Sequence, residues 1–105
     1  MVAPIHDPST PQAREGYVLL GTIEEARGRD AAAAAAWLQA LQIRFDPALA
    51  VRAAEALSRA EGHVTDASAA LSRQALVGAP PDAPWRAAAE AQLGAGAFGP
   101  RKQQN

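Results

Sequence analysis

The chain contains no cysteine and few residues of the other types that usually carry chemistry. Its 105 residues include two histidines, one methionine, two tryptophans, one tyrosine and two phenylalanines. The absence of cysteine excludes disulfides, thiolate catalysis and Cys-ligated zinc. It also excludes the Cys-x-x-Cys-His motif that attaches haem covalently. It leaves open the compartment in which the protein works.

Long apolar runs and a charge excess are also lacking. No apolar run approaches the roughly 20 residues needed to span a bilayer. The 10 basic and 11 acidic residues nearly balance, so no general attraction to nucleic acid or anionic membranes is implied. Residues 1–8 lack a basic segment followed by an apolar one, so we expect no signal peptide. We therefore expect a cytosolic protein or a soluble piece of something longer, folded as one domain with a thin core.

Catalytic and metal-binding patterns are missing as well. Neither His6 nor His63 has a second histidine or a carboxylate at a spacing typical of metal ligands, and helix capping explains Asp66 better. No serine lies in a Gly-x-Ser-x-Gly motif, and no glycine-rich phosphate loop precedes a helix. We therefore predict a protein that is not an enzyme and has no metal site and no cofactor.

A 34-residue period organises what is present. Gly28, Gly62 and Gly96 are 34 residues apart, and so are Pro47 and Pro81. Four further sets share the spacing: Tyr17, Val51 and Trp85; Leu20, Ala54 and Ala88; Ala33 and Ala67; Trp37 and Leu71. Alanine makes up 28 residues, so alanine matches carry little weight. The alternative is a low-complexity alanine-rich chain whose periodicity is accidental.

Caps and turns divide the chain into helices. Thr10 or Ser9 can cap the first helix, Gly28 suits a left-handed helix end, and Asp30 can cap the second. Asp46 followed by Pro47 is a further cap with proline at the first helical position. We expect helices over about 12–27, 31–44, 47–61, 65–77 and 83–93. The expected organisation is a flexible lead-in (1–11), a helical domain (12–93, with units 12–46 and 47–80 and a terminal helix 83–93) and a flexible tail (94–105).

Large apolar residues at helical spacing predict the core. Tyr17, Leu20 and Ile23 can form one apolar stripe. Residues 31–36 are alanines, which favour a helix and allow a neighbouring backbone to approach closely. We expect Trp37 to be packed between helices, and likewise Trp85.

The first unit resembles the tetratricopeptide repeat (TPR) family. Matches to its pattern are Tyr17, Leu20, Gly21, Ala33, Trp37, Ala40 and Pro47. Glu24 stands where that family usually has tyrosine, and the unit's ending is two residues longer than usual. The second unit departs at Glu55 and Gln74. The resemblance covers about residues 12–93 and implies an all-α fold: a short TPR-type α-solenoid of two helix-turn-helix repeats and a C-terminal capping helix.

A narrower resemblance concerns three segments. The sequences at 16–21, 60–71 and 80–93 resemble the periplasmic TPR domain of the apocytochrome c chaperone of bacterial cytochrome c maturation. Its most specific part is Asp82-Ala-Pro-Trp85, because a similar block opens the last helix in that family. The resemblance implies a periplasmic location, tethered to the inner membrane by segments that this chain lacks. It also implies the C-terminal helix of apocytochrome c and haem-ligation components as partners.

In the TPR family the first helix of each repeat lines a groove that holds a peptide or helix. The 34-residue register places the following residues in that groove: Val18, Thr22, Glu25, Leu49, Arg52, Ala56, Arg59, Arg86, Glu90 and Leu93. Arg52, Arg59 and Arg86 could converge on a carboxylate. Alternatively, these arginines are solvated charges paired with Glu55 and Glu90. No asparagine precedes Asn105, which disfavours the family's carboxylate clamp.

These observations leave three functional hypotheses. The first is a non-catalytic chaperone or adaptor that holds apocytochrome c for haem attachment. The second is a general TPR scaffold that assembles another complex, in the cytoplasm if it is free-standing. The third is a regulatory fragment of a larger enzyme.

Overall fold

Five helices make up the part of the chain that the structure describes. In this computed structural model residues 10–102 are described, with side-chain surroundings as far as Gly94. The helices are α1 (Pro11–Ala26), α2 (Asp30–Ile43), α3 (Pro47–Glu61), α4 (Asp66–Leu76) and α5 (Arg86–Lys102). Residues 10–102 contain no strand, so the predicted all-α class is confirmed. Residues 1–9 of the expected lead-in and 103–105 of the expected tail lie outside the described residues.

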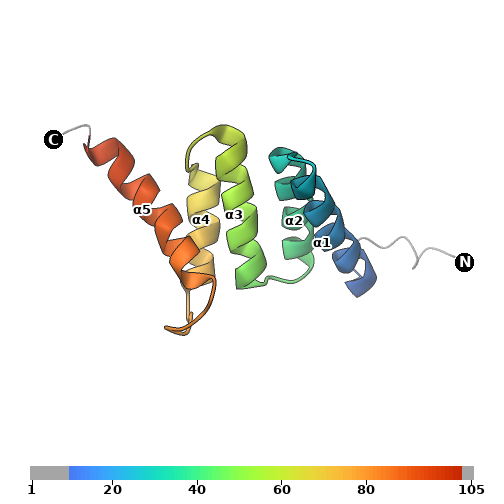
Figure 1. The fold of residues 1–105 in the computed structure, drawn as a ribbon. Coiled ribbons are helices and arrows are strands. Elements are labelled where there is room, and N and C mark those ends of the chain that lie inside the picture. Colours follow the sequence, from blue (N-terminus) through green and yellow to red (C-terminus); the bar gives the residue numbers. More distant parts are fainter. Residues whose placement is uncertain (1–9, 103–105) are drawn as a thin grey trace, which may run out of the picture.

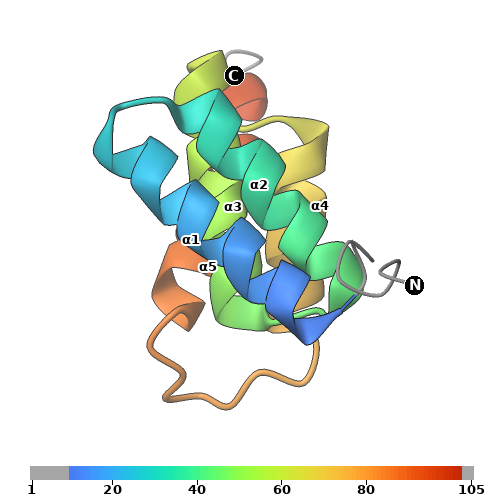
Figure 2. The same cartoon turned by 90° about the vertical axis from the view of Figure 1, so that its right-hand side faces the viewer.

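The helices form a row in which neighbours in sequence pack together. The main contacts join α1 to α2, α2 to α3, α3 to α4 and α4 to α5, and α3 also contacts α5. The row runs from α1 to α5 across Figure 1. The view along the row shows two layers, with α1, α3 and α5 on one side and α2 and α4 on the other (Figure 2).

Side-chain caps fix three of the helix starts. Thr10 Oγ1 accepts a hydrogen bond from the Ala13 amide at 3.1 Å, and Asp46 Oδ2 accepts one from Leu49 at 2.8 Å. Thr65 and Ser68 form a reciprocal capping box at α4. Asp30 does not cap α2 as expected: it is the first helical residue, and Arg29 occupies the cap position without a side-chain hydrogen bond. The Asp30 carboxylate instead pairs with Arg59.

Two glycines 34 residues apart adopt the left-handed conformation after a helix, Gly28 one residue beyond the C-cap of α1 and Gly62 as the C-cap of α3. Gly28 and Gly62 have φ angles of 76° and 83°, in the left-handed region that glycine adopts without a steric penalty from Cβ. Each glycine lies in the turn between an odd-numbered helix and the next even-numbered one. The predicted repeat of this turn is therefore present in the backbone.

The core is built mainly from alanine around one large side chain. Trp37 is fully buried, as expected, and its indole Nε1 donates to the Val18 carbonyl at 3.1 Å. Gly21 allows this arrangement, because a Cβ built there would lie 2.2 Å from Trp37 Nε1. Trp85 is partly buried and packs against the same core.

Polar contacts add to the packing of α3, α4 and α5. Ser58 Oγ of α3 lies 2.7 Å from Gln92 Oε1 of α5 and 3.2 Å from Ser68 Oγ of α4. Ala89 of α5 is fully buried. The fifth helix is thus joined to both preceding helices.

The predicted apolar stripe on α1 is only partly covered. Tyr17 packs against the core, but Leu20 and Ile23 are 45% and 41% exposed, and neighbouring Leu19 is 60% exposed. The reason is that α2 is the helix that α1 mainly contacts. One side of α1 therefore remains open within the described part of the chain.

The last helix differs from the expectation at both ends. It begins at Arg86 instead of residue 83 and continues to Lys102 through the glycines from Gly94 onward. Glycine costs about 1 kcal/mol relative to alanine inside a helix, which weakens a helix without ending it. An ending of the kind seen at Gly28 needs a positive φ, and Gly94 does not have one.

Candidate functional site

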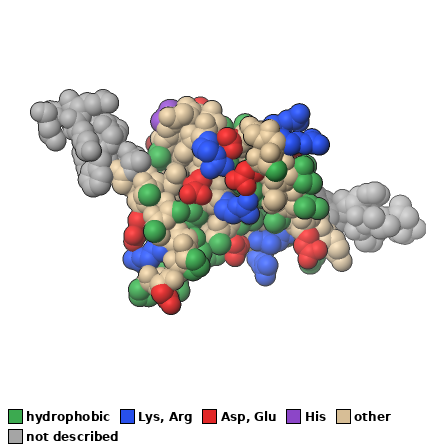
Figure 3. All heavy atoms as spheres, viewed as in Figure 1, with side chains coloured by type: hydrophobic (Ala, Val, Ile, Leu, Met, Phe, Trp, Pro, Cys, Tyr) green, Lys and Arg blue, Asp and Glu red, His purple; other side chains and the backbone are tan. Residues whose placement is uncertain are grey.

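The odd-numbered helices present the surface that carries most of the predicted groove residues. We call the A-helix face the surface of α1 and α3 around Val18, Thr22, Glu25, Leu49, Arg52 and Arg59; within it Val18 is half-buried and the predicted groove residue Leu49 is only 6% exposed. The helices α1, α3 and α5 face the viewer in Figure 1. In the same view, acidic and basic side chains alternate over the middle of this surface (Figure 3).

Charged side chains from α1, α2 and α3 form a connected network. Glu25 accepts hydrogen bonds from Arg52 at 2.8 Å and from Arg59 at 3.0 Å, each through a different carboxylate oxygen. Arg59 also donates to Asp30 at 3.0 Å. Two of the three predicted arginines therefore converge on a carboxylate, and that carboxylate belongs to the chain itself. They do not pair with Glu55 or Glu90.

Arg52 and Arg59 have further contacts besides Glu25. The Arg52 guanidinium lies 4.5 Å from the centroid of the Trp37 ring, a cation–π contact. Burial would lower the pKa of Arg59, but its hydrogen bond to Asp30 and the charges of Asp30 and Glu25 together raise that pKa above its usual value. Arg59 therefore stays charged at any physiological pH.

We expect this network to organise the surface while adding little stability. The side chains of Arg59 and Glu25 are 46% and 33% exposed, so water screens their attraction. A double-mutant cycle of Glu25→Gln and Arg59→Gln, measured by urea unfolding, should give a coupling energy of about 0.2–1 kcal/mol. The coupling should fall further in 1 M salt, where the screening length is about 3 Å. A coupling above about 2 kcal/mol would instead make the network a main support of the fold.

A pocket of about 320 Å³ lies at the end of the A-helix face where α3 begins. Three predicted groove residues line it, Val18, Leu49 and Arg52. The other residues of its wall, which the 34-residue register does not predict, are Arg14, Arg44, Asp46 and Ala48.

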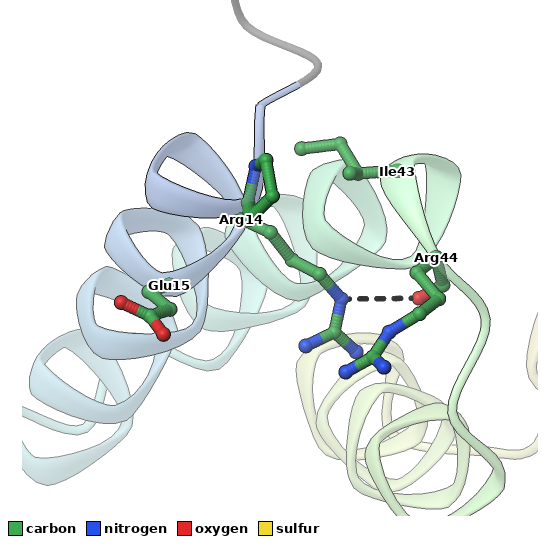
Figure 4. Close-up of a pocket in the computed structure, with 5 residues that line it drawn as sticks. Arg14, Glu15, Ile43 and Arg44 are labelled. Carbon is green, nitrogen blue, oxygen red and sulfur yellow. Dashed lines mark hydrogen bonds between the residues drawn. The ribbon is translucent and has the colours of Figure 1, made fainter.

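A second pocket of about 410 Å³ adjoins the first and shares Arg14 and Arg44 with it. In Figure 4 these two side chains extend from α1 and from the end of α2 into the same space. Arg14 Nε donates to the Arg44 carbonyl oxygen at 3.2 Å. The antiparallel pairing of α1 and α2 could have revealed this proximity, because it brings the start of one helix to the end of the next.

The other predicted groove residues lie outside the two pockets. Ala56 is fully buried, so its assignment to the open groove was wrong; alanine is small enough to fit between packed helices. Thr22 is exposed and donates to the Val18 carbonyl at 3.1 Å. On α5, Arg86 pairs with Glu90 at 3.0 Å and donates to the Ala79 carbonyl at 3.2 Å.

The third arginine therefore does not join the other two. Within residues 10–94, Arg86 pairs with Glu90, whereas Arg52 and Arg59 share Glu25. Leu93, also on α5, is half-buried.

The described residues hold neither a cluster of metal ligands nor a membrane-spanning helix. They contain no group of three or more His, Cys, Asp or Glu residues placed to hold a metal ion. None of the helices in this part of the chain combines the length and the apolarity required to cross a membrane.

Comparison with known proteins identified no relative. No family model matches the chain, and neither a curated protein nor a solved structure does. Functional inference for this chain therefore depends on its residues and their geometry.

Proposed function

We propose that this chain is a TPR-type helical-repeat module that binds a segment of another protein without catalysing a reaction. The observation that carries the proposal is the pocketed surface between α1 and α3, where apolar walls (Val18 and Leu49) adjoin arginines, among them Arg52, which pairs with Glu25. Such a surface suits an amphipathic segment, because its apolar side can bury against the walls while its charges meet the arginines. The repeated turns at Gly28 and Gly62 support the repeat assignment.

In its narrower form, the proposal is that the segment comes from apocytochrome c, held for haem attachment in a bacterial periplasm. The support is the resemblance of residues 80–93 to the apocytochrome c chaperone. Asp82-Ala-Pro-Trp85 immediately precedes α5, and Trp85 packs against the core. This block would then position the last helix, while the A-helix face would bind the C-terminal helix of the apocytochrome.

The narrower proposal is tested by titrating the chain with a labelled peptide of an apocytochrome c C-terminal helix and following fluorescence polarisation. We expect saturable binding, and a scrambled peptide of the same composition should not bind. Absence of binding up to about 1 mM, which corresponds to a free energy weaker than about 4 kcal/mol, would contradict the apocytochrome proposal. Binding of unrelated amphipathic helices with equal affinity would favour a general scaffold instead.

A matched pair of variants locates the binding surface. Thr22 lies exposed on the A-helix face, whereas Gln39 is exposed on α2 in the other layer. Thr22→Arg should weaken peptide binding at least about fivefold, because it places an extra bulky charge in the contact area. Gln39→Arg adds the same charge elsewhere and should leave the affinity unchanged. Equal weakening by both variants would place the binding site outside the A-helix face.

A further inference from the structure

Arg14 and Arg44 differ from the arginines of the charge network in their surroundings. Arg52 and Arg59 of the network pair with carboxylates of the chain, and so does Arg29, which pairs with Glu24. Arg14 and Arg44 form no ion pair within the described residues, yet both line the same two pockets. Figure 4 shows their guanidinium ends next to each other. Two cations held together without a counter-ion repel each other, and a bound anion would remove that repulsion.

The two acidic residues that line the pockets, Asp46 and Glu15, form no ion pair with Arg14 or Arg44 in residues 10–94. Asp46 lines the first pocket, but its Oδ2 accepts the Leu49 amide at 2.8 Å as the cap of α3. Glu15 lines the second pocket, and in Figure 4 its carboxylate points away from both arginines. Arg14 Nε already donates to the Arg44 carbonyl oxygen. The Nη groups of Arg14 and the guanidinium of Arg44 remain to bind a ligand.

The other groups around Arg14 and Arg44 indicate what kind of anion the site would bind. The pocket lies at the N-terminus of α3, where peptide dipoles favour an anion, and the Asp46 carboxylate already fills part of that role as the cap. A guanidinium group matches a carboxylate through two parallel hydrogen bonds. The aliphatic side chains of Val18 and Leu49 form the adjacent wall, which a fully hydrated inorganic anion would not use.

We propose that Arg14 and Arg44 form a binding site for a carboxylate that lies next to an aliphatic group. The site would hold such a carboxylate of the bound protein segment, and in that role it rests on the proposed function. The carboxylate is either a chain terminus or an acidic side chain, since the chemistry of recognition is the same for both. The site lies where the start of α1 meets the end of α2, apart from Arg59 and Arg86.

Small probes test the site without any protein partner. We would titrate the intact chain with N-acetyl-leucine and follow the Nε–Hε resonances of its arginines by NMR. The Arg14 and Arg44 signals should shift saturably, with a dissociation constant of about 1–10 mM, as for a few charge-assisted contacts at a wet surface. N-acetyl-leucine amide lacks the carboxylate and should cause no such shift. Equal shifts from the amide, or from inorganic phosphate at the same concentration, would overturn the proposal.

A matched pair of substitutions assigns the effect to the pocket. Arg44 and Arg73 are both exposed and both lack an ion pair within the described residues, but Arg73 lies on α4, outside both pockets. Arg44→Gln should weaken N-acetyl-leucine binding at least about fivefold by removing one charge-assisted contact. Arg73→Gln removes the same charge and should have no effect. Equal losses in both variants would show non-specific attraction and would overturn the proposal.

Two further comparisons identify the source of the carboxylate and separate this proposal from the preceding one. Acetyl-glutamate amide carries only a side-chain carboxylate, so tighter binding than N-acetyl-leucine would indicate an acidic side chain, and weaker binding a chain terminus. Failure of the apocytochrome peptide to bind would leave the probe shifts intact. Conversely, a peptide that binds while the probes cause no shift would support the A-helix face and refute the carboxylate site.

Discussion

Trp37→Ala is expected to destabilise the chain by about 3–5 kcal/mol, the usual cost of truncating a buried tryptophan. Trp37 is fully buried, and its indole fills the space between α1 and α2 that alanines leave. The substitution also removes the hydrogen bond to the Val18 carbonyl and the surface on which Arg52 stacks. Urea unfolding followed by circular dichroism measures the effect. An unchanged unfolding midpoint would contradict the assignment of Trp37 to the core.

Trp37→Phe is the control that separates packing from hydrogen bonding. Phenylalanine retains most of the buried aromatic surface but cannot donate to the Val18 carbonyl. That carbonyl also accepts from Thr22 Oγ1 at 3.1 Å, so it keeps a polar partner. The cost should therefore be below half of that for Trp37→Ala. Equal costs for the two variants would show that the hydrogen bond, and not the packing, matters at this position.

Gly21→Ala is expected to destabilise the chain by about 1–3 kcal/mol, the usual cost of overpacking a core. The new Cβ would lie 2.2–2.6 Å from three atoms of the Trp37 indole. A fully buried indole has no solvent-side space into which it can move, so the helices must separate. For a domain of this size each kcal/mol lowers the melting temperature by about 4–8 °C. Thermal unfolding therefore measures the effect directly.

The same helix provides a matched control for this substitution. Gly16 is exposed on α1, and a Cβ placed there would meet nothing within 4 Å. Gly16→Ala should therefore stabilise the chain by up to about 1 kcal/mol through helix propensity alone. In a Trp37→Ala background the clash at Gly21 disappears, so Gly21→Ala should become neutral or stabilising. Destabilisation of the same size in both backgrounds would exclude the Trp37 contact as its cause.

Local signals in the sequence predicted much of the fold. The left-handed turn requires Gly28, and the start of α3 depends on Asp46 and Pro47. Both signals act within a few residues of their own position. The exposure of Leu20 and Ile23 could not be predicted in this way. It depends on which helices lie beside α1, and the apolar spacing of a helix does not report how many neighbours it has. The end of α5 was missed for a different reason, because glycine weakens a helix without fixing where it stops.

The site was predicted less completely than the fold. The 34-residue register placed Val18, Leu49 and Arg52 near one another, and the structure brings them into one pocket. It also placed Ala56 in the groove, because a register assigns a helix face but not the depth of a small side chain. Arg14 and Arg44 lie outside the groove positions of the repeat pattern. Their proximity depends on the antiparallel packing of α1 against α2.

The alanine content of the core has a consequence for conformational entropy. Among residues 10–94, ten of the fourteen buried apolar residues are alanines, and alanine loses no rotamer freedom on burial. Ordering such a core costs little entropy, but each methyl group also contributes little hydrophobic free energy, about 0.8 kcal/mol per buried carbon. Because the backbones approach closely, larger side chains would strain the helix contacts rather than fill free volume. New binding specificities in such a chain would therefore have to arise from its exposed residues.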